Sequence, residues 1–351
     1  MLFSEMVVEE AQGALLAHSL RTAKGKISKG QELSADDVLA LRNAGYSRIY
    51  AARLEEGDMQ EDVAAHSLSK GIAGEHVLVG EAGTGRVYLY AMCDGLLEID
   101  TPAIHRFNEV DQAIALATLL PLAPVRAGQV IATLKIIPFS VKNTLVEQMI
   151  AELTAKQNTI IKVRPFALTN VALIQTYLPD TPQKILDKTT ATLTTRLERM
   201  GGSMALAREL RCAHKIDELA LAITYMRSRV GCELLVISSA SATLDKDDVL
   251  PTAIRLAGAT VERVGMPVDP GNLLVLGDSA GVPIIGMPGC ARSPKTNGFD
   301  WVLQRLSAAL PVSSRDIAMM GVGGLLTSFS SQPNAGDTTS SDYSRLKGAL
   351  V

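Results

Sequence analysis

The sequence predicts two folded parts, of which the larger is a doubly wound α/β domain with a mostly parallel sheet. From residue 164 to residue 312, short apolar runs alternate with longer helical patterns, which is typical of βα units. Two of these runs, ELLVIS and PIIGM, are continuously apolar, as expected for strands that are buried on both faces of a parallel sheet. At 351 residues, the chain is also too long for one ordinary hydrophobic core.

The first part, residues 1–160, is predicted to be an α+β region. It opens with a helix-like pattern, and Ser34 then caps an amphipathic helix that ends at Gly45. Glycine turns, among them the fragment GTGR at residues 83–86, separate alternating runs that predict β-strands. The remaining expected elements are a strand at 47–54, a hairpin or meander at 80–100, a strand at 129–141 and a helix at 141–157.

The elements of the α/β domain follow one another with short connections. We expect strands at 170–177, 203–210, 232–238, 259–266, 272–278 and 282–289, and helices at 181–202, 215–231, 248–258 and 293–310. Residues 313–351 form a C-terminal extension whose segment 328–342 is rich in Ser, Thr, Asp and Asn. Because such a composition cannot bury a core, we expect a disordered tail.

Composition excludes several classes of function. The formal charge is −3 and charged residues make up 20% of the chain, so no strongly basic face for nucleic acid is expected. The longest apolar runs are interrupted by proline, so no membrane span is expected. The opening residues do not resemble a signal peptide, because they carry Glu5, Glu9 and Glu10 and show no cationic stretch followed by an apolar core. We therefore expect a cytoplasmic protein.

Three loops are the candidate ligand site. In an open parallel sheet, ligands bind beyond the carboxyl ends of the strands, where successive crossovers leave on opposite faces. The loops that follow strands at this edge are Gln175 to Pro182, Ser238 to Asp248 and Met287 to Lys295.

The second of these loops, SSASATLDKDDVLP, combines small residues with acids. Small side chains allow a ligand to approach the backbone, and backbone N–H groups at the start of a helix suit phosphate. A simpler interpretation is that Asp247 or Asp248 only caps the next helix, which Pro251 helps to begin. Capping explains one acid, whereas three clustered carboxylates repel unless a cation lies between them, so Asp245 and Asp248 are also candidate magnesium ligands.

The third loop, GMPGCARSPK, joins a buried strand to a helix. Its Pro288 and Gly289 shape the turn, and Arg292 and Lys295 could hold a phosphate through charge-assisted hydrogen bonds. The alternative is a rigid turn whose basic side chains face water.

The residues of these loops resemble a known family. The run from Asp248 to Pro294 is similar to the end of the molybdopterin-binding domain of MogA, MoaB, MoeA and gephyrin, and residues 1–160 look like the opening lobe of MoeA. The segment GMPGCARSPKTNGFDWVLQRL is most similar to a subgroup in which this domain is fused to a MobA-like nucleotidyltransferase. The resemblance covers about residues 1 to 312 and implies a MogA-like fold for residues 164–312.

The resemblance implies roles for particular residues. Ser238, Ser239, Ser241 and Thr243 stand where the family has its glycine- and serine-rich pterin loop, and Pro288, Gly289, Arg292 and Lys295 stand at the turn after the last buried strand. By the same resemblance, Asp187, Asp217 and Asp248 match family acids that handle magnesium, molybdate or polar pterin groups. They are the expected catalytic residues.

The implied activity is that of a molybdopterin molybdotransferase, a transferase that inserts molybdate into adenylylated molybdopterin with magnesium. MoeA-like proteins are dimers, so the resemblance also implies a homodimer. An alternative of another class is a non-catalytic carrier that delivers molybdopterin to a MobA-like nucleotidyltransferase or to a molybdoenzyme. Ser238, Ser239 and Thr243 replace family glycines, which favours the carrier, whereas the three acids favour the enzyme.

Overall fold

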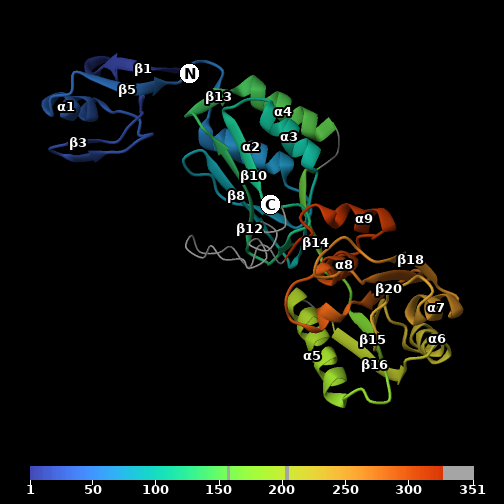
Figure 1. Ribbon diagram of the computed structural model, residues 1–351. Coiled ribbons are helices and arrows are strands. Elements are labelled where there is room, and N and C mark those ends of the chain that lie inside the picture. Colours follow the sequence, from blue (N-terminus) through green and yellow to red (C-terminus); the bar gives the residue numbers. More distant parts are fainter. Residues whose placement is uncertain (156–158, 202–204, 327–351) are drawn as a thin grey trace, which may run out of the picture. The chain divides into compact units, whose positions relative to one another are not determined.

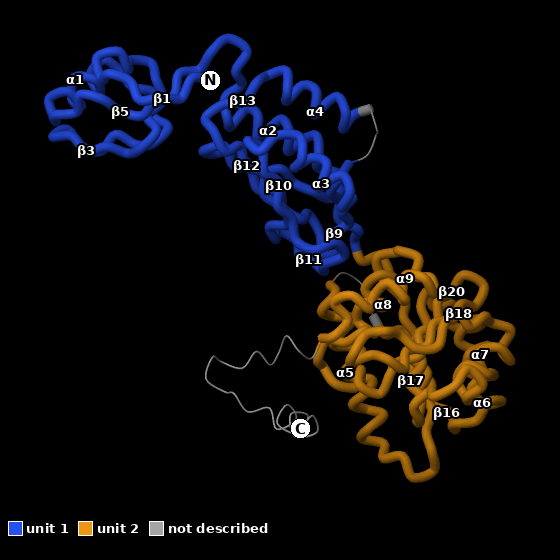
Figure 2. Tube along the Cα trace, turned by 45° about the horizontal axis from the view of Figure 1, so that its top comes forward, with its two compact units in different colours: residues 1–165 blue, residues 166–351 orange. Residues whose placement is uncertain are grey.

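The computed structural model describes residues 1–155, 159–201 and 205–326, and the chain divides into two compact units at Pro165 (Figures 1 and 2). Unit 1 comprises residues 1–165, and unit 2 begins at Phe166. The segment 328–342, for which a disordered tail was expected, lies outside the described residues.

The first 53 residues of unit 1 have a small core of their own. Strands β1 (Leu2–Val7), β5 (Arg48–Arg53) and β2 (Leu15–Leu16) form one antiparallel sheet, and β3 (Leu20–Thr22) and β4 (Gly25–Ile27) form a hairpin. Ser34 caps α1 (Ala35–Asn43) as predicted, since its side chain accepts from the Asp37 N–H and Gly45 follows the helix at φ +88°. The prediction of a helix at the start of the chain was wrong. Strand β1 pairs with β5 along its whole length, and only the short η1 (Val8–Glu10) is helical in this opening segment.

The rest of unit 1 packs antiparallel sheets against three helices. Its core is one cluster of buried residues that includes Leu68, Leu89 and Leu134. The sheets have the orders β10-β12-β8-β7, β11-β9-β14 and β13-β6. The bounds are β6 Asp58–Gln60, α2 Glu61–Ile72, β7 Val77–Val79, β8 Arg86–Ala91, β9 Gly95–Ile99, α3 Thr101–Glu109, β10 Ile114–Thr118, β11 Pro124–Val125, β12 Val130–Ile136, β13 Ser140–Lys142, α4 Asn143–Ala155 and β14 Ile161–Pro165.

Gly95 lies where two strands approach its backbone closely. It pairs with Val125 of β11 and with Pro165 of β14, and a Cβ added to it would lie 2.1 Å from the backbone oxygen of Arg164. We therefore expect Gly95→Ala to lower the free energy of unfolding by about 1–3 kcal/mol through overpacking. Chemical denaturation measures this loss. Gly83→Ala is the matched control, because an added Cβ at Gly83 meets nothing within 4 Å; equal losses for the two variants would contradict the packing argument.

Unit 2 is built on a six-stranded sheet of order β16-β15-β17-β20-β19-β18. Its strands are β15 (Asn170–Tyr177), β16 (Ala205–Ala213), β17 (Leu234–Ser238), β18 (Thr260–Val264), β19 (Val275–Ser279) and β20 (Val282–Met287). The pairs among β16, β15, β17 and β20 are parallel, as predicted. Strand β19 pairs antiparallel with both of its neighbours, because a tight turn through Ala280 and Gly281 joins it directly to β20.

Helices cover both faces of this sheet, which makes it doubly wound. On one face, α5 (Gln183–Met200) and α8 (Gly298–Ser307) pack with Val171 and Leu173 of β15. On the other face, α6 (Ile216–Tyr225) and α7 (Val249–Leu256) pack with Ala172 and Ile174 (Figure 1). A π-helical turn at Met226–Val230 continues α6, and α9 (Ser314–Ala318), η3 (Gly289–Arg292) and η4 (Met319–Gly321) complete the unit.

Candidate functional site

The switch of crossover direction lies between β15 and β17. The chain leaves β15 through α5 on one face and returns from β16 to β17 through α6 on the other, and β20 is the next strand beyond β17. Because these strands are parallel, their carboxyl ends lie at one edge of the sheet. The structure therefore brings the loops after β15, β17 and β20 to this edge.

Two of these loops line one small cavity. Its volume is about 70 Å³, which leaves room for about five waters at roughly 10–15 Å³ each. Five waters together occupy about the space of one tetrahedral oxyanion. The lining includes six residues that were expected to bind the pterin or its phosphate, and Leu273, from the segment before β19, which was not expected. The expected residues are Ser239, Ser241, Thr243, Pro288, Gly289 and, as a cation, Arg292.

Arg292 brings a half-buried positive charge to the cavity. Its Nη2 donates to the backbone oxygen of Ser239 at 2.6 Å and to Ser238 Oγ at 3.4 Å. Among the described residues no carboxylate lies within ion-pair distance of it, and burial lowers the pKa of the Arg292 guanidinium from its ordinary value. A buried cation without a counter-ion is costly, so an anion in the cavity would stabilise it.

Two buried polar atoms at this cavity lack a hydrogen-bond partner in the described part of the chain. One is Nε of the Arg292 guanidinium itself, and the other is Oγ of Ser239. A buried donor that makes no hydrogen bond costs about 1–3 kcal/mol. A guanidinium Nε–H and a hydroxyl can both donate to an oxyanion, so these two groups suit a phosphate.

Arg196 of α5 holds the loop that carries Arg292. Its side chain is 6% exposed and pairs with Asp300 at 2.7 Å. The same guanidinium donates to the backbone oxygens of Ala291, Ser293 and Lys295 at 2.8, 2.6 and 3.2 Å. Because every one of these partners lies between residues 291 and 300, Arg196 fixes this segment from the neighbouring helix.

On the other side of the cavity, Thr176 holds the β17 loop. Thr176 Oγ1 accepts from the backbone N–H of Ala240 at 2.8 Å and is 2.9 Å from Nδ1 of His214, at the end of β16. Burial lowers the pKa of His214 below its ordinary value of 6.5, and the negative charge of Asp248 opposes this shift. Thr176 and His214 were not predicted as site residues, although Thr176 lies near the carboxyl end of β15 and His214 directly follows β16.

A polar network connects β15, β16 and α5 nearby. Gln175 Nε2 donates to Glu209, and Glu209 also accepts from Thr190 and pairs with Arg211. Burial raises the pKa of Glu209, but these hydrogen bonds outweigh it, so the pKa lies below its ordinary value. Arg211 also pairs with Asp187 at 2.9 Å. The expected catalytic acid Asp187 is thus an exposed residue inside α5 and not at a helix start.

The other predicted acids lie outside the cavity lining. Asp248 caps α7: its Oδ1 accepts from the Val249 N–H at 2.7 Å and its Oδ2 from the Leu244 N–H at 3.0 Å. Asp245 accepts from the Asp247 N–H, and Asp217 lies exposed in the first turn of α6. In the described residues, no hydrogen bond or ion pair joins any two of Asp187, Asp217 and Asp248.

The acids do not fit a magnesium ion held by protein ligands. Within residues 1–155, 159–201 and 205–326, no group of three or more His, Cys, Asp or Glu residues could hold a metal. Both oxygens of Asp248 are already engaged by backbone N–H groups. Lys295, the second predicted cation, is exposed and does not line the cavity; its backbone oxygen accepts from Arg196.

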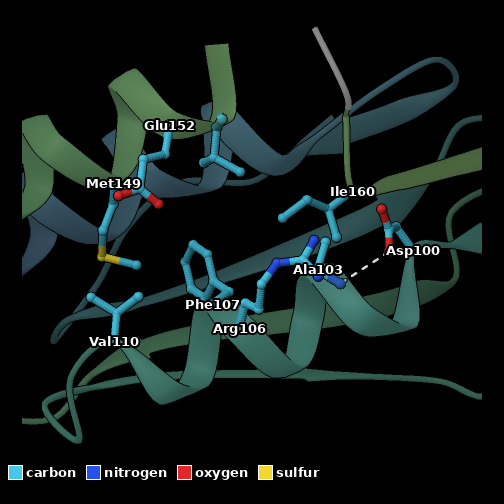
Figure 3. Close-up of a pocket in the computed structure, with 9 residues that line it drawn as sticks. Asp100, Ala103, Arg106, Phe107, Val110, Met149, Glu152 and Ile160 are labelled. Atoms are coloured by element: carbon cyan, nitrogen blue, oxygen red, sulfur yellow. Dashed lines mark hydrogen bonds between the residues drawn. The ribbon is translucent and has the colours of Figure 1, made fainter. Parts of the chain in front are cut away.

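Unit 1 contains a separate cavity of about 140 Å³ between α3 and α4 (Figure 3). Phe107, Met149 and Ile160 form its apolar floor. Asp100 at its rim caps α3 by accepting from the Ala103 N–H at 3.0 Å. Because two acids, Asp100 and Glu152, accompany the one cation, Arg106, this cavity does not suit an anion.

Comparisons with known proteins identify no characterised relative by sequence. A family model described as a domain of unknown function (DUF8806) matches residues 5–53, and no curated protein matches the chain. The structure of CinA from Thermoplasma acidophilum, a protein with unknown function, is 15% identical, covers 36% of this chain and 90% of its own, and has a TM-score of 0.26.

A second similar structure is the molybdopterin biosynthesis MoeA protein from Pyrococcus horikosii. It is 13% identical, covers 88% of this chain and 75% of its own, and has a TM-score of 0.30. At these TM-scores neither likeness supports a statement about the site, which rests on the geometry described above. In the described residues no helix has the length and apolar character needed to cross a membrane.

Proposed function

We propose that unit 2 binds molybdopterin, with the phosphate of the ligand in the cavity between the β17 and β20 loops. Two observations on the described residues support this proposal: the buried donors Arg292 Nε and Ser239 Oγ have no partner, and the Arg292 guanidinium has no carboxylate partner. The choice of a pterin as the rest of the ligand is supported by the sequence resemblance of residues 1 to 312. The protein would then act in the late steps of molybdenum cofactor synthesis.

The ligand that copurifies with the full chain tests this proposal. The protein is produced in a host that makes molybdopterin and then denatured, and the released pterin is oxidised and measured by its fluorescence. We expect pterin in up to one equivalent per chain. Finding none in the wild-type protein, while a known molybdopterin-binding protein from the same host carries it, contradicts the proposal.

The more specific proposal is a molybdotransferase that inserts molybdate into adenylylated molybdopterin. In that reaction magnesium would arrive with the ligand, since this ion typically binds one or two carboxylates together with phosphates and water. The second candidate is a carrier that hands molybdopterin to a nucleotidyltransferase or a molybdoenzyme. The carrier is favoured by Asp248, whose two oxygens both accept from backbone N–H groups, and by Asp187, which pairs with Arg211.

Release of AMP distinguishes the two candidates. The full chain is incubated with adenylylated molybdopterin, magnesium and molybdate, and AMP is measured over time. Turnover that Asp248→Ala abolishes supports the enzyme. Tight binding without AMP supports the carrier, and an unchanged rate in Asp248→Ala contradicts a catalytic role for this residue.

Gly289 offers a direct test of the cavity. An added Cβ at this position meets nothing within 4 Å, and its φ requires no glycine, so Gly289→Ala should fold normally. The methyl group would take up space in a cavity that holds only about five waters. We expect about tenfold weaker binding of inorganic sulfate in calorimetry and an unchanged melting temperature. Unchanged binding would place the ligand elsewhere.

A further inference from the structure

Two side chains hold neighbouring residues of the β17 loop from opposite sides. Arg292 donates to the backbone oxygen of Ser239, and Thr176 accepts from the backbone N–H of Ala240. The buried hydroxyl of Ser239 has no partner in the described part of the chain, so its placement decides whether it can reach an anion. Thr176 is fully buried, and its hydroxyl therefore sets the position of this backbone.

The hydrogen bond between Thr176 and His214 has a defined direction when the ring is neutral. The Thr176 proton forms no hydrogen bond with any other acceptor among the described residues, so the neutral ring that satisfies it accepts at Nδ1, 2.9 Å away. The ring proton is then on Nε2. The backbone N–H of His214 also donates to the oxygen of Tyr177, so the ring is held close to the end of β15.

Protonation of the ring disturbs this arrangement. A protonated His214 carries a proton on Nδ1 and can no longer accept from Thr176. The threonine proton must then turn away from the ring, and among the described residues no other acceptor is within hydrogen-bond distance of it. A buried donor without a partner is unfavourable, so protonation destabilises the arrangement in which Thr176 holds Ala240.

We propose that neutral His214, acting through Thr176, positions the Ser239–Ala240 backbone for anion binding, and that protonation of the ring weakens that binding. His214 is thus a positioning residue for the site proposed above, and the inference rests on that site.

The charges around the ring do not change the direction of this effect. Asp248 on α7 is the charged group that acts on His214, and its effect favours the protonated ring. On the side of α6, Lys215 lies 3.9 Å from Glu218, and Glu218 also accepts from the Ala213 N–H. On the side of β15, the neighbour is the exposed Tyr177. A new positive charge near an anion site would by itself strengthen anion binding, so the sign of the pH effect separates positioning from simple electrostatics.

Calorimetric titration of the full chain with sulfate tests the proposal, because neither sulfate nor Arg292 changes charge between about pH 5 and pH 8. We expect the dissociation constant of the wild-type protein to rise about tenfold as the pH falls from 8 to 5.5. Binding that is equal at both pH values, or tighter at the lower one, overturns the proposal and leaves the anion site standing.

Matched variants separate the roles of the two side chains. In His214→Asn, the carboxamide oxygen can accept from Thr176 but does not titrate, so binding should match the wild-type protein at pH 8 and no longer change with pH. Thr176→Ser keeps the hydroxyl and should behave as the wild-type protein does. Thr176→Val removes it and should bind about tenfold more weakly at pH 8 without a pH dependence.

A measurement without ligand tests the role of His214 independently of whether the cavity binds an anion. The amide resonance of Ala240 in nuclear magnetic resonance spectra should shift with the titration of His214 in the wild-type protein and stay constant in His214→Asn. An Ala240 amide that does not follow His214 overturns the proposal even if sulfate binds. A failure of sulfate to bind at any pH, with the Ala240 shift present, contradicts the proposed function instead.

Discussion

Replacing Arg196 with methionine is expected to lower the free energy of unfolding of unit 2 by roughly 3–5 kcal/mol, as the loss of one partner of a buried ion pair does. The substitution keeps the volume and apolar stem of the side chain but leaves Asp300, whose side chain is only 14% exposed, without its cation. It also removes the donors for three backbone oxygens between Ala291 and Lys295. The single tryptophan, Trp301, lies next to Asp300, so its fluorescence during chemical denaturation reports this unit.

The matched control is Arg199→Met, on the same helix. Arg199 is exposed, so its replacement should change the free energy of unfolding by less than about 0.5 kcal/mol. Similar losses for the two variants would mean that Arg196 contributes as any arginine on α5 does. Because Arg196 anchors the segment that carries Arg292, the Arg196→Met variant should also bind sulfate more weakly.

Replacing Arg292 with methionine is expected to weaken anion binding and to leave stability nearly unchanged. Without ligand, the removal of a half-buried charge that has no carboxylate partner among the described residues offsets the loss of the hydrogen bond to the Ser239 backbone oxygen. Sulfate or phosphate binding should weaken about 10- to 100-fold, as the loss of charge-assisted hydrogen bonds implies. The rise in melting temperature with added sulfate should therefore be smaller than in the wild-type protein.

Lys295→Met provides the control for this prediction. Sulfate stabilises folded proteins in general by exclusion from their surface, and this contribution should be the same in all variants. Lys295 is exposed and outside the cavity lining, so its replacement should leave binding nearly unchanged. If Arg292→Met and Lys295→Met weaken binding equally, the basic loop acts through its total charge and not through Arg292 in the cavity.

The fold of unit 2 could largely be predicted, because the local hydrophobic pattern determines where its strands and helices lie. The uninterrupted apolar run of β17 and the alternation of strands with helices indicated a doubly wound parallel sheet, which the structure confirms. The reversed direction of β19 could not be inferred, because an apolar strand looks the same in either direction. In unit 1, α2 and α3 were not predicted, and the opening strand β1 was taken for a helix because its pairing with β5 is not visible in local periodicity.

Residues of the candidate site could be predicted only where they lie together in one loop. Ser239 and Gly289, which line the cavity, were predicted as ligand-binding residues from loop composition, because small residues after a buried strand suggest a ligand. The contact between Thr176 and His214 spans 38 positions, and that between Arg196 and Ala291 spans 95. Such contacts depend on strand order and register, which the residues themselves do not encode locally. The predicted loop Gln175 to Pro182 included Thr176 without identifying its partner.

The reversal of β19 has a consequence for selectivity. Since β19 starts at the edge where β20 ends, the segment before it reaches the ligand cavity, and Leu273 becomes part of the wall. Were β19 aligned with the other strands, that segment would begin at the far edge of the sheet. A molecule extending past the oxyanion pocket on this side would therefore meet the hydrocarbon side chain of Leu273.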